Sequence, residues 1–322
     1  MLDDHRCVTS MSVGVPQLLL TKLAGIDLRN PVIAAAGTCG YVDELADIFD
    51  LSEIGAVTTK SITREGREGN APWRIIPTRS GMLNAIGLAN KGIDRFLAEE
   101  VPRVRGCKAV VIGSVAGHTI DDYVAVAGAM DASQEFRAIE VNVSCPNTST
   151  GRHFGADPST LREVLNAVRG VVSHAKLFVK LAPDMADPIA MSAMAIECGA
   201  NALVLCNTMP AMAIDVHTRK PRLSRGKGGL SGPAVHPIVV RIVHDVYAAV
   251  ARDAGVPIIG LGGVMSWEDA AELILAGATA VGMGTALFVD PKSPRRVVRG
   301  LDKWACDQGV TQISQLVGQV VS

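Results

Sequence analysis

One cysteine stands between amide side chains at the end of an apolar run. Residues 139–147 are Ile-Glu-Val-Asn-Val-Ser-Cys-Pro-Asn, so Asn142 and Asn147 flank Cys145. Pro146 has no N–H to give to a neighbouring strand, so a strand is expected to end beside the cysteine. Asparagine amides donate and accept hydrogen bonds, which suits the edge of a planar heterocycle. We therefore interpret Cys145 as a candidate proton-abstracting base.

Two lysines occupy apolar runs that look buried. Lys60 ends the run 56–60, and Lys180 lies in the run 176–181. A single lysine at a strand end can extend its ammonium into solvent. Burying an ammonium without a partner is costly, so two such lysines favour an anionic ligand or cofactor.

Glycines follow two late apolar runs. They lie in Gly260-Leu-Gly-Gly-Val264 and Gly282-Met-Gly-Thr285, with a third cluster at Gly228-Gly-Leu-Ser-Gly232. In barrel enzymes, backbone N–H groups after the seventh and eighth strands commonly bind phosphate. The first two clusters predict a phosphate site; the third would be weak evidence alone.

Eight short apolar runs predict strands, and helix-like segments lie between most of them. The predicted strands are 31–36, 56–60, 109–115, 138–143, 176–181, 202–206, 257–261 and 279–283. The predicted helices are 43–50, 121–130, 158–172, 187–198, 237–254, 267–276 and 294–308. Alternating strands and helices predict parallel strands, and eight units predict an α/β fold of the (β/α)8 TIM-barrel type. A doubly wound sheet would normally show G-x-G-x-x-G after the first strand, whereas Gly37-Thr-Cys-Gly40 stands there.

The chain is expected to form one domain. Residues 1–16 look like a loose N-terminal extension, and 17–322 are predicted to form a single barrel domain opened by a short hairpin within 17–30. Segments 61–90 and 209–234 exceed the usual connection length, and we expect them to be long functional loops over the C-terminal face of the barrel.

Composition argues against several other classes of protein. The net charge is -1 and aromatic residues make up 4%, which gives no basis for nucleic-acid binding. The seven cysteines form no C-x-x-C pair, so a cysteine-rich iron–sulfur or zinc motif within this chain is excluded, and a reducing, cytoplasmic location is expected. Residues 1–17 do not resemble a signal peptide. Residues 273–289 carry no charge, but their glycines favour a helix end, a turn and a strand over a membrane span.

Together these motifs resemble those of the class 1 dihydroorotate dehydrogenases of pyrimidine biosynthesis. The resemblance is carried by Asn142-Val-Ser-Cys-Pro-Asn147, Met82-Leu-Asn-Ala-Ile-Gly-Leu88, Val179-Lys-Leu-Ala-Pro183, Gly228-Gly-Leu-Ser-Gly-Pro233 and Gly262-Gly-Val264. It implies an FMN-binding barrel that oxidises dihydroorotate to orotate, with a cysteine base where class 2 enzymes use serine and carry an N-terminal membrane segment. The segment 81–88 is similar to subclass 1B, whose members pass electrons to NAD through a partner subunit that holds FAD and a 2Fe–2S cluster.

The resemblance also implies roles for particular residues. Cys145 would remove the C5 proton while hydride passes from C6 to flavin N5, and Lys180 would lie near the N1–O2 edge of the flavin. Substrate would contact Lys60, Asn84, Ile86, Gly87, Leu88, Asn142, Asn147, Asn207 and Thr208. The cofactor would contact Ala36, Gly37, Lys60, Ser61, Asn142, Lys180, Cys206, Gly232, Gly262, Gly263, Gly284 and Thr285. A homodimer, or a heterotetramer with the electron-transfer subunit, is expected.

Other functions remain open at this point. The nearest is a class 1A homodimer that reduces fumarate, and dihydropyrimidine dehydrogenase is a related flavin enzyme. From other classes, the glycines would suit a flavin-free isomerase or lyase acting on a phosphorylated sugar, or a non-catalytic barrel. The segment Gly151-Arg-His-Phe-Gly155 departs from the family pattern in the presumed substrate-covering loop.

Overall fold

The core of the fold is a closed barrel of eight parallel strands. The computed structural model describes residues 17–143, 157–185 and 187–321. In order around the barrel the strands are β3 (Val32–Ala34), β4 (Ala56–Thr58), β7 (Val110–Val115), β8 (Ala138–Asn142), β9 (Lys176–Lys180), β10 (Ala202–Leu205), β15 (Ile258–Leu261) and β16 (Ala280–Met283). Each of the eight predicted runs contributes one strand, which confirms the (β/α)8 barrel.

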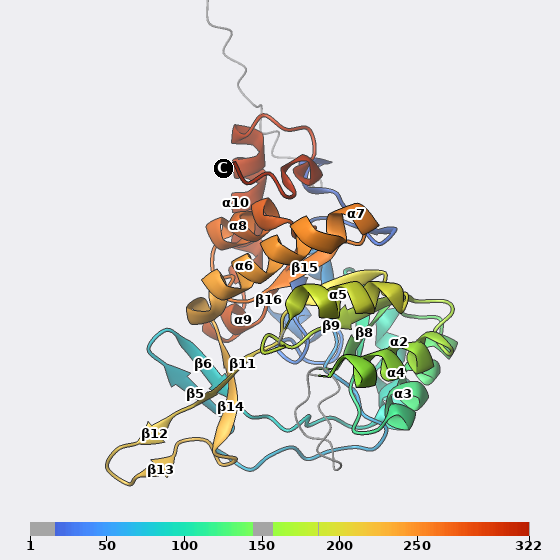
Figure 1. Ribbon diagram of the computed structural model, residues 1–322, viewed down its shortest axis with the longest axis vertical. Coiled ribbons are helices and arrows are strands. Elements are labelled where there is room, and N and C mark those ends of the chain that lie inside the picture. Colours follow the sequence, from blue (N-terminus) through green and yellow to red (C-terminus); the bar gives the residue numbers. More distant parts are fainter. Residues whose placement is uncertain (1–16, 144–156, 186, 322) are drawn as a thin grey trace, which may run out of the picture.

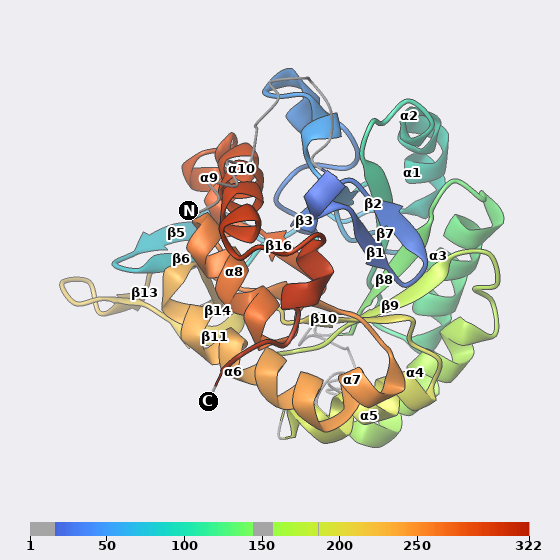
Figure 2. The same cartoon turned by 90° about the horizontal axis from the view of Figure 1, so that it is seen from above.

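Helices surround the strands, as Figures 1 and 2 show from two directions. They are α1 (Ile93–Glu99), α2 (Val101–Val104), α3 (Ile120–Ala132), α4 (Pro158–Arg169), α5 (Pro188–Glu197), α6 (His236–Val246), α7 (Arg252–Ala254), α8 (Trp267–Ala276), α9 (Thr285–Val289) and α10 (Ser293–Asp307). Between α6 and α7 the segment η5 (Tyr247–Ala251) is a π-helical turn, and 3-10 turns form η1 (Gln17–Leu19), η4 (Pro233–Val235) and η6 (Ile313–Leu316). Asp157 and Ser266 cap α4 and α8 as the sequence predicted, each accepting a backbone N–H.

The predicted helix 43–50 is wrong. The region instead contains two 3-10 turns, η2 (Glu44–Asp47) and η3 (Leu51–Glu53). The Glu44 carboxylate accepts the N–H groups of Tyr41 and Val42, and Asp50 accepts the N–H of Ser52. These short bonds from side chain to backbone compete with a continuous helix.

The barrel interior is packed at its N-terminal end and polar at its C-terminal end. Ile33, Ile112 and Phe178 belong to a buried cluster that also contains Leu23 and Leu28. These two leucines come from the predicted N-terminal hairpin, formed by β1 (Thr21–Leu23) and β2 (Ile26–Leu28). The hairpin therefore closes the end of the barrel opposite to the one where chemistry is expected.

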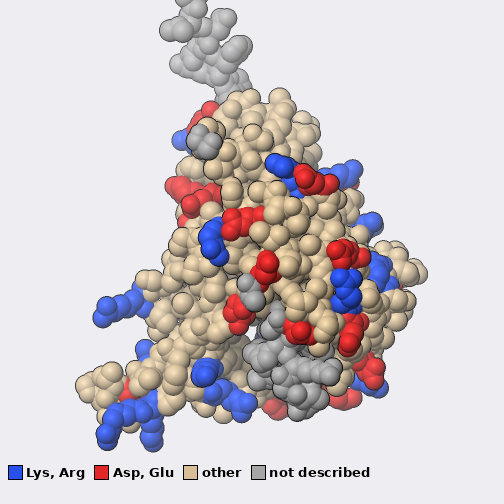
Figure 3. Space-filling model, viewed as in Figure 1, with Lys and Arg blue, Asp and Glu red and all other residues tan. Residues whose placement is uncertain are grey.

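Segments 61–90 and 209–234 were expected to be long loops, but both contain strands. They form the antiparallel sheet β11 (Met209–Met212), β14 (Lys227–Ser231), β6 (Gly81–Asn84) and β5 (Ile75–Thr78), and the hairpin β12 (Ile214–Asp215) and β13 (Lys220–Pro221). Ile76, Leu83 and Leu223 form a small buried core for this sheet. The β12–β13 hairpin projects at the lower left of Figure 1, and basic side chains gather on it in Figure 3, among them the exposed Arg219, Lys220 and Arg222.

The uncharged stretch 273–289 contains the end of α8 and strand β16, as predicted, and also the short helix α9, which was not predicted. In the described part of the chain, one helical run, Pro233–Ala254, is long and apolar enough to span a membrane. Its α6 segment packs against β10, β15, α5 and α8. Packing against the barrel accounts for the apolar face of this helix.

Candidate active site

A cavity of about 980 Å³ opens at the C-terminal end of the barrel, where the four-stranded sheet joins the strand ends. Residues in or just after seven of the barrel strands reach it, and His118 reaches it from the loop after β7, as a barrel active site requires. It is lined by Ala36, Gly37, Lys60, Ser61, Asn84, Ile86, Gly87, Leu88, Asn142, Lys180, Cys206, Asn207, Thr208, Gly232, Gly262, Gly263, Gly284 and Thr285. These are all the predicted site residues that the structure describes. Cys145 and Asn147, like residues 151–155, lie outside the described residues.

The predicted phosphate-binding glycines adopt backbone geometry that excludes larger residues. A Cβ on Gly263, whose φ is +71°, would lie 2.6 Å from the Cβ of His236, and one on Gly232, with φ +95°, would lie 2.8 Å from the Cα of Gly81. Thr285 Oγ1 donates to Ser231 Oγ at 2.8 Å. The close approach of three chain segments requires glycine at these positions, so backbone rather than side chains lines this part of the cavity.

His236 was missed by sequence reasoning. Its Nδ1 lies 2.8 Å from the carbonyl oxygen of Gly262, and its Nε2 lies 3.1 Å from Glu272 Oε2. The His236 ring thereby fixes the glycine loop after β15. In the sequence, only the position of this histidine just beyond the Gly228–Gly232 cluster could have pointed to it.

Lys180 has a buried counter-ion. Its Nζ lies 3.7 Å from Glu140 Oε1, and the two residues are 4% and 3% exposed. Glu140 was not predicted as a site residue, although the signal that singled out the lysines, a charge within an apolar run, applies to it equally. The pair places a compensated cation at the wall of the cavity.

Amide side chains are ordered at the ends of β8 and β10. Asn142 Nδ2 donates to Ser61 Oγ at 3.3 Å, and its Oδ1 accepts from Asn207 Nδ2 at 3.3 Å. Asn207 Oδ1 in turn accepts the N–H of Thr208 at 2.8 Å. The Tyr123 hydroxyl donates to the carbonyl of Asn142 at 2.8 Å. These bonds hold both amides in one orientation beside the cavity, as a ligand with fixed donors and acceptors requires.

Lys60 lies in an electrostatically unfavourable place. Burial, with a smaller contribution from the nearby Arg74, lowers the pKa of its ammonium. Its Nζ lies 3.7 Å from the point where a Cβ on Gly37 would stand. A cation held at this cost gains from an anionic ligand that compensates its charge.

The rim of the cavity contains a strained turn. Gly87 has φ +76°, and a Cβ there would lie 2.7 Å from the Asn70 side chain. Leu88 also has a positive φ, +55°, which is uncommon for a residue with a branched side chain. Asn90 Nδ2 donates to the Leu88 carbonyl at 2.7 Å and stabilises the turn. Such strain is typical of a ligand-contacting segment.

Two further cysteines lie near strand ends, but neither is suited to act as a base. Burial raises the pKa of Cys39 to about 12, with Glu44 and Cys107 adding to the effect. Burial likewise raises the pKa of Cys206 to about 12, although Lys180 opposes it. Both thiols therefore stay protonated near neutral pH. Cys145, which lies outside the described residues, stays the predicted base.

The fold is that of the (β/α)8-barrel enzymes, with a cavity at its C-terminal end where two lysines, ordered amides and glycine loops meet. The family profile described as dihydroorotate dehydrogenase matches residues 18–304. The chain is 44% identical over 298 residues to the "Dihydroorotate dehydrogenase B (NAD(+)), catalytic subunit" of Trichlorobacter lovleyi, covering 92% of this chain and 96% of that one. It is 43% identical over 301 residues to the protein of the same name from Geotalea daltonii, covering 93% and 97%.

A relative from Solibacter usitatus, provisionally named dihydroorotate dehydrogenase A (fumarate), is 42% identical over 304 residues, or 94% of this chain and 98% of that one. The chain therefore belongs to the dihydroorotate dehydrogenase family. It is a flavin-dependent oxidoreductase that oxidises dihydroorotate in pyrimidine biosynthesis. The alternatives of a flavin-free isomerase and a non-catalytic barrel are not supported.

Proposed function

We propose that the chain is the FMN-binding catalytic subunit of an NAD-linked, class 1B dihydroorotate dehydrogenase. The observation that carries the proposal is the single cavity that combines Lys60, Lys180, the glycine loops and the ordered amides. Relatives named as B-type catalytic subunits, at 42 to 44% identity, support the subclass. That name also supports a partner subunit, which would hold FAD and a 2Fe–2S cluster and carry electrons to NAD. A homodimer within a heterotetramer and a cytoplasmic location belong to the same proposal.

The cavity fits FMN at both ends. At one end the phosphate would be held by the backbone of Gly232, Gly263 and Gly284 and by the Thr285 side chain. A larger residue at Gly232 or Gly263 would clash with neighbouring atoms. Lys180 would face the pyrimidine edge of the flavin, where negative charge develops on reduction. When bound, FMN supplies the acceptor for the hydride that leaves C6 of dihydroorotate.

The substrate would lie on the side of the cavity formed by Lys60 and the asparagines. The Lys60 ammonium would pair with the carboxylate, which relieves the unfavourable position of this charge. Asn84, Asn142 and Asn207 would hold the ring amides, helped by Ile86, Gly87, Leu88, Thr208 and Asn147. Cys145 would accept the C5 proton as thiolate. A free thiol has a pKa of about 8.5, so the reaction should accelerate with rising pH.

Anaerobic mixing with dihydroorotate tests the proposal. The purified chain should be yellow, and dihydroorotate should bleach its flavin absorbance in the absence of oxygen. A colourless protein, or a flavin that dihydroorotate does not bleach, would contradict it.

The Solibacter relative favours a second candidate, the class 1A enzyme that reduces fumarate. Turnover of dihydroorotate by the lone chain with fumarate as acceptor would support class 1A. Turnover that needs the electron-transfer subunit and NAD supports class 1B.

Substitution of Cys145 tests the base. C145A should retain FMN but reduce it about 100-fold or more slowly, because general-base catalysis contributes at least this much. C145S should keep part of the rate, with its optimum at higher pH, since a hydroxyl is a weaker acid. Stopped-flow absorbance measures both rates; an alanine variant as fast as the parent protein would refute the assignment.

A further inference from the structure

Glu140 is a buried carboxylate inside the barrel to which no role is yet assigned. It lies on β8 two residues before Asn142, and its carboxylate contacts two groups from neighbouring strands. Lys180 on β9 is 3.7 Å from Oε1, and the Ser114 hydroxyl on β7 donates to Oε1 at 3.3 Å. Placing a carboxylate at 3% exposure is costly unless it has a function or a close partner, and 3.7 Å is long for an ion pair of purely structural value.

Glu140 also ends a chain of hydrogen bonds that reaches the amide side of the cavity. Ser114 donates to Glu140, so the 2.9 Å contact between Ser61 and Ser114 has Ser61 as its donor. Ser61 then accepts from Asn142 Nδ2. A carboxylate can only accept hydrogen bonds, so with Glu140 at the end every bond in this series donates toward Glu140 or toward Ser61 in a fixed sense.

The same carboxylate therefore acts on both ends of the site. Toward β9 it holds the Lys180 ammonium and offsets part of its charge, and through Ser114 and Ser61 it fixes the orientation of the Asn142 amide. The two lysines at the cavity differ in this respect, because burial lowers the pKa of Lys60 whereas Lys180 has Glu140 beside it.

We propose that Glu140 is a positioning residue that, through Lys180, sets how strongly the site stabilises negative charge on the flavin. The inference rests on the proposed function, since it needs a flavin beside Lys180. With the carboxylate present, part of the positive field of Lys180 at the flavin is cancelled. Without it, the full charge of the lysine faces the flavin and favours the anionic reduced ring.

The test is E140Q in the FMN-loaded protein, because glutamine keeps the shape and removes the charge. Sulfite is the probe, since it adds to oxidised flavin and leaves negative charge on the ring. We expect sulfite to bind roughly tenfold more tightly to E140Q than to the parent protein. The midpoint potential should rise by about 30 mV, the equivalent of tenfold for a two-electron couple.

The matched control is E100Q. Glu100, at 5% exposure, is also buried and paired with a lysine, but its partner Lys91 does not line the cavity, whereas Lys180, the partner of Glu140, does. E100Q should leave the sulfite affinity and the potential at parent values, so loss of a buried charge alone does not explain a shift. Equal shifts in E100Q and E140Q would overturn the proposal.

If E140Q does not fold, E140D keeps the charge but withdraws it from Lys180 by one methylene. A two- to threefold gain in sulfite affinity is then expected, and a flavin-bound E140D with parent affinity overturns the inference. A parent protein that lacks flavin, or whose flavin dihydroorotate does not reduce, overturns the proposed function instead. If the parent protein passes this test but E140Q has unchanged sulfite affinity and midpoint potential, only the role of Glu140 is overturned.

Discussion

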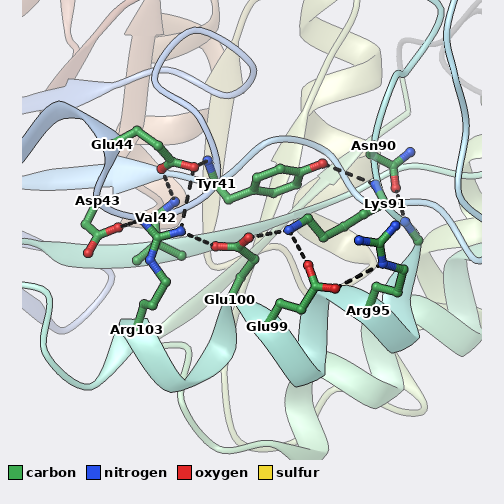
Figure 4. Close-up of polar contacts among 11 residues, drawn as sticks. Tyr41, Val42, Asp43, Glu44, Asn90, Lys91, Arg95, Glu99, Glu100 and Arg103 are labelled. Carbon is green, nitrogen blue, oxygen red and sulfur yellow. Dashed lines mark hydrogen bonds and ion pairs between the residues drawn. The ribbon is translucent and has the colours of Figure 1, made fainter.

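Two buried glutamates, each paired with a lysine, lie in very different surroundings. Glu100 on the outside of the barrel contacts Lys91 and accepts from Arg103 Nη1 at 2.6 Å. Figure 4 shows how these charges join those of neighbouring segments. Glu140 inside the barrel has Lys180 at 3.7 Å. Glu100, Lys91 and Arg103 belong to an outer cluster of closely paired charges, which indicates a role in stabilising the fold. The looser pair of Glu140 and Lys180 leaves part of the lysine charge available to a ligand.

The outer cluster connects parts of the chain that are distant in sequence. Arg103 pairs with Asp43 and lies 3.9 Å from Glu44, whose carboxylate accepts the N–H groups of Tyr41 and Val42. Burial alone would raise the pKa of Glu44, but these backbone hydrogen bonds and Arg103 lower it overall. The cluster thus fastens the loop after β3 to helices α1 and α2.

The largest effect is expected from K180M. It removes the cation beside the flavin and leaves Glu140 buried without its counter-ion, so the free energy of unfolding should fall by about 3 kcal/mol. FMN should be largely lost during purification. The double variant K180M/E140Q should recover most of the stability, because no charge is left buried, but not the FMN. Urea unfolding and flavin content measure the two effects; FMN retention and stability equal to the parent's in K180M would contradict both roles.

A smaller effect is expected when the outer cluster is broken. E100Q leaves Lys91 and Arg103 without their shared carboxylate, but both side chains reach water, so stability should fall by only about 1 to 2 kcal/mol. The rate of flavin reduction by dihydroorotate should not change. Urea unfolding and stopped-flow absorbance provide the check, and a slower flavin reduction in E100Q would show that the two clusters are coupled.

Sequence patterns located the barrel and the wall of its cavity for a clear physical reason. Strands buried on both faces form short apolar runs, and chemistry-bearing residues such as Lys60, Asn142 and Asn207 stand where those runs end. Their positions around one cavity then follow from the closure of the barrel.

The charge clusters could not be predicted in the same way. The pairing of Arg103 with Asp43 joins residues 60 positions apart, and nothing local indicates it. Helix α1 was missed because Gly92 precedes it and provides no capping side chain. The four-stranded sheet was missed because its strands contain Pro77, Pro210 and the pair Gly228–Gly229, which weaken a strand pattern. A Cβ on Gly229 would lie 1.8 Å from Thr208 Oγ1, so tertiary approach rather than local preference explains the glycine.

The smallest effect on stability, with the opposite sign, is expected at Lys60. A lysine whose folded-state pKa is lowered destabilises the fold while it is charged, so K60M should raise the free energy of unfolding by about 0.5 kcal/mol at neutral pH. This gain should shrink as pH rises from the lowered pKa toward about 10.4, because the folded-state ammonium loses its proton first and then no longer opposes folding.

The same variant should lose about 100-fold in kcat/KM for dihydroorotate, since the substrate carboxylate loses its charged partner. Urea unfolding at two pH values and steady-state kinetics test the two halves. A lower free energy of unfolding in K60M would show that the Lys60 charge stabilises the fold, as the charges of the outer cluster do. An active K60M would remove it from the substrate side of the cavity, because a cation that binds substrate cannot be replaced by a thioether without loss.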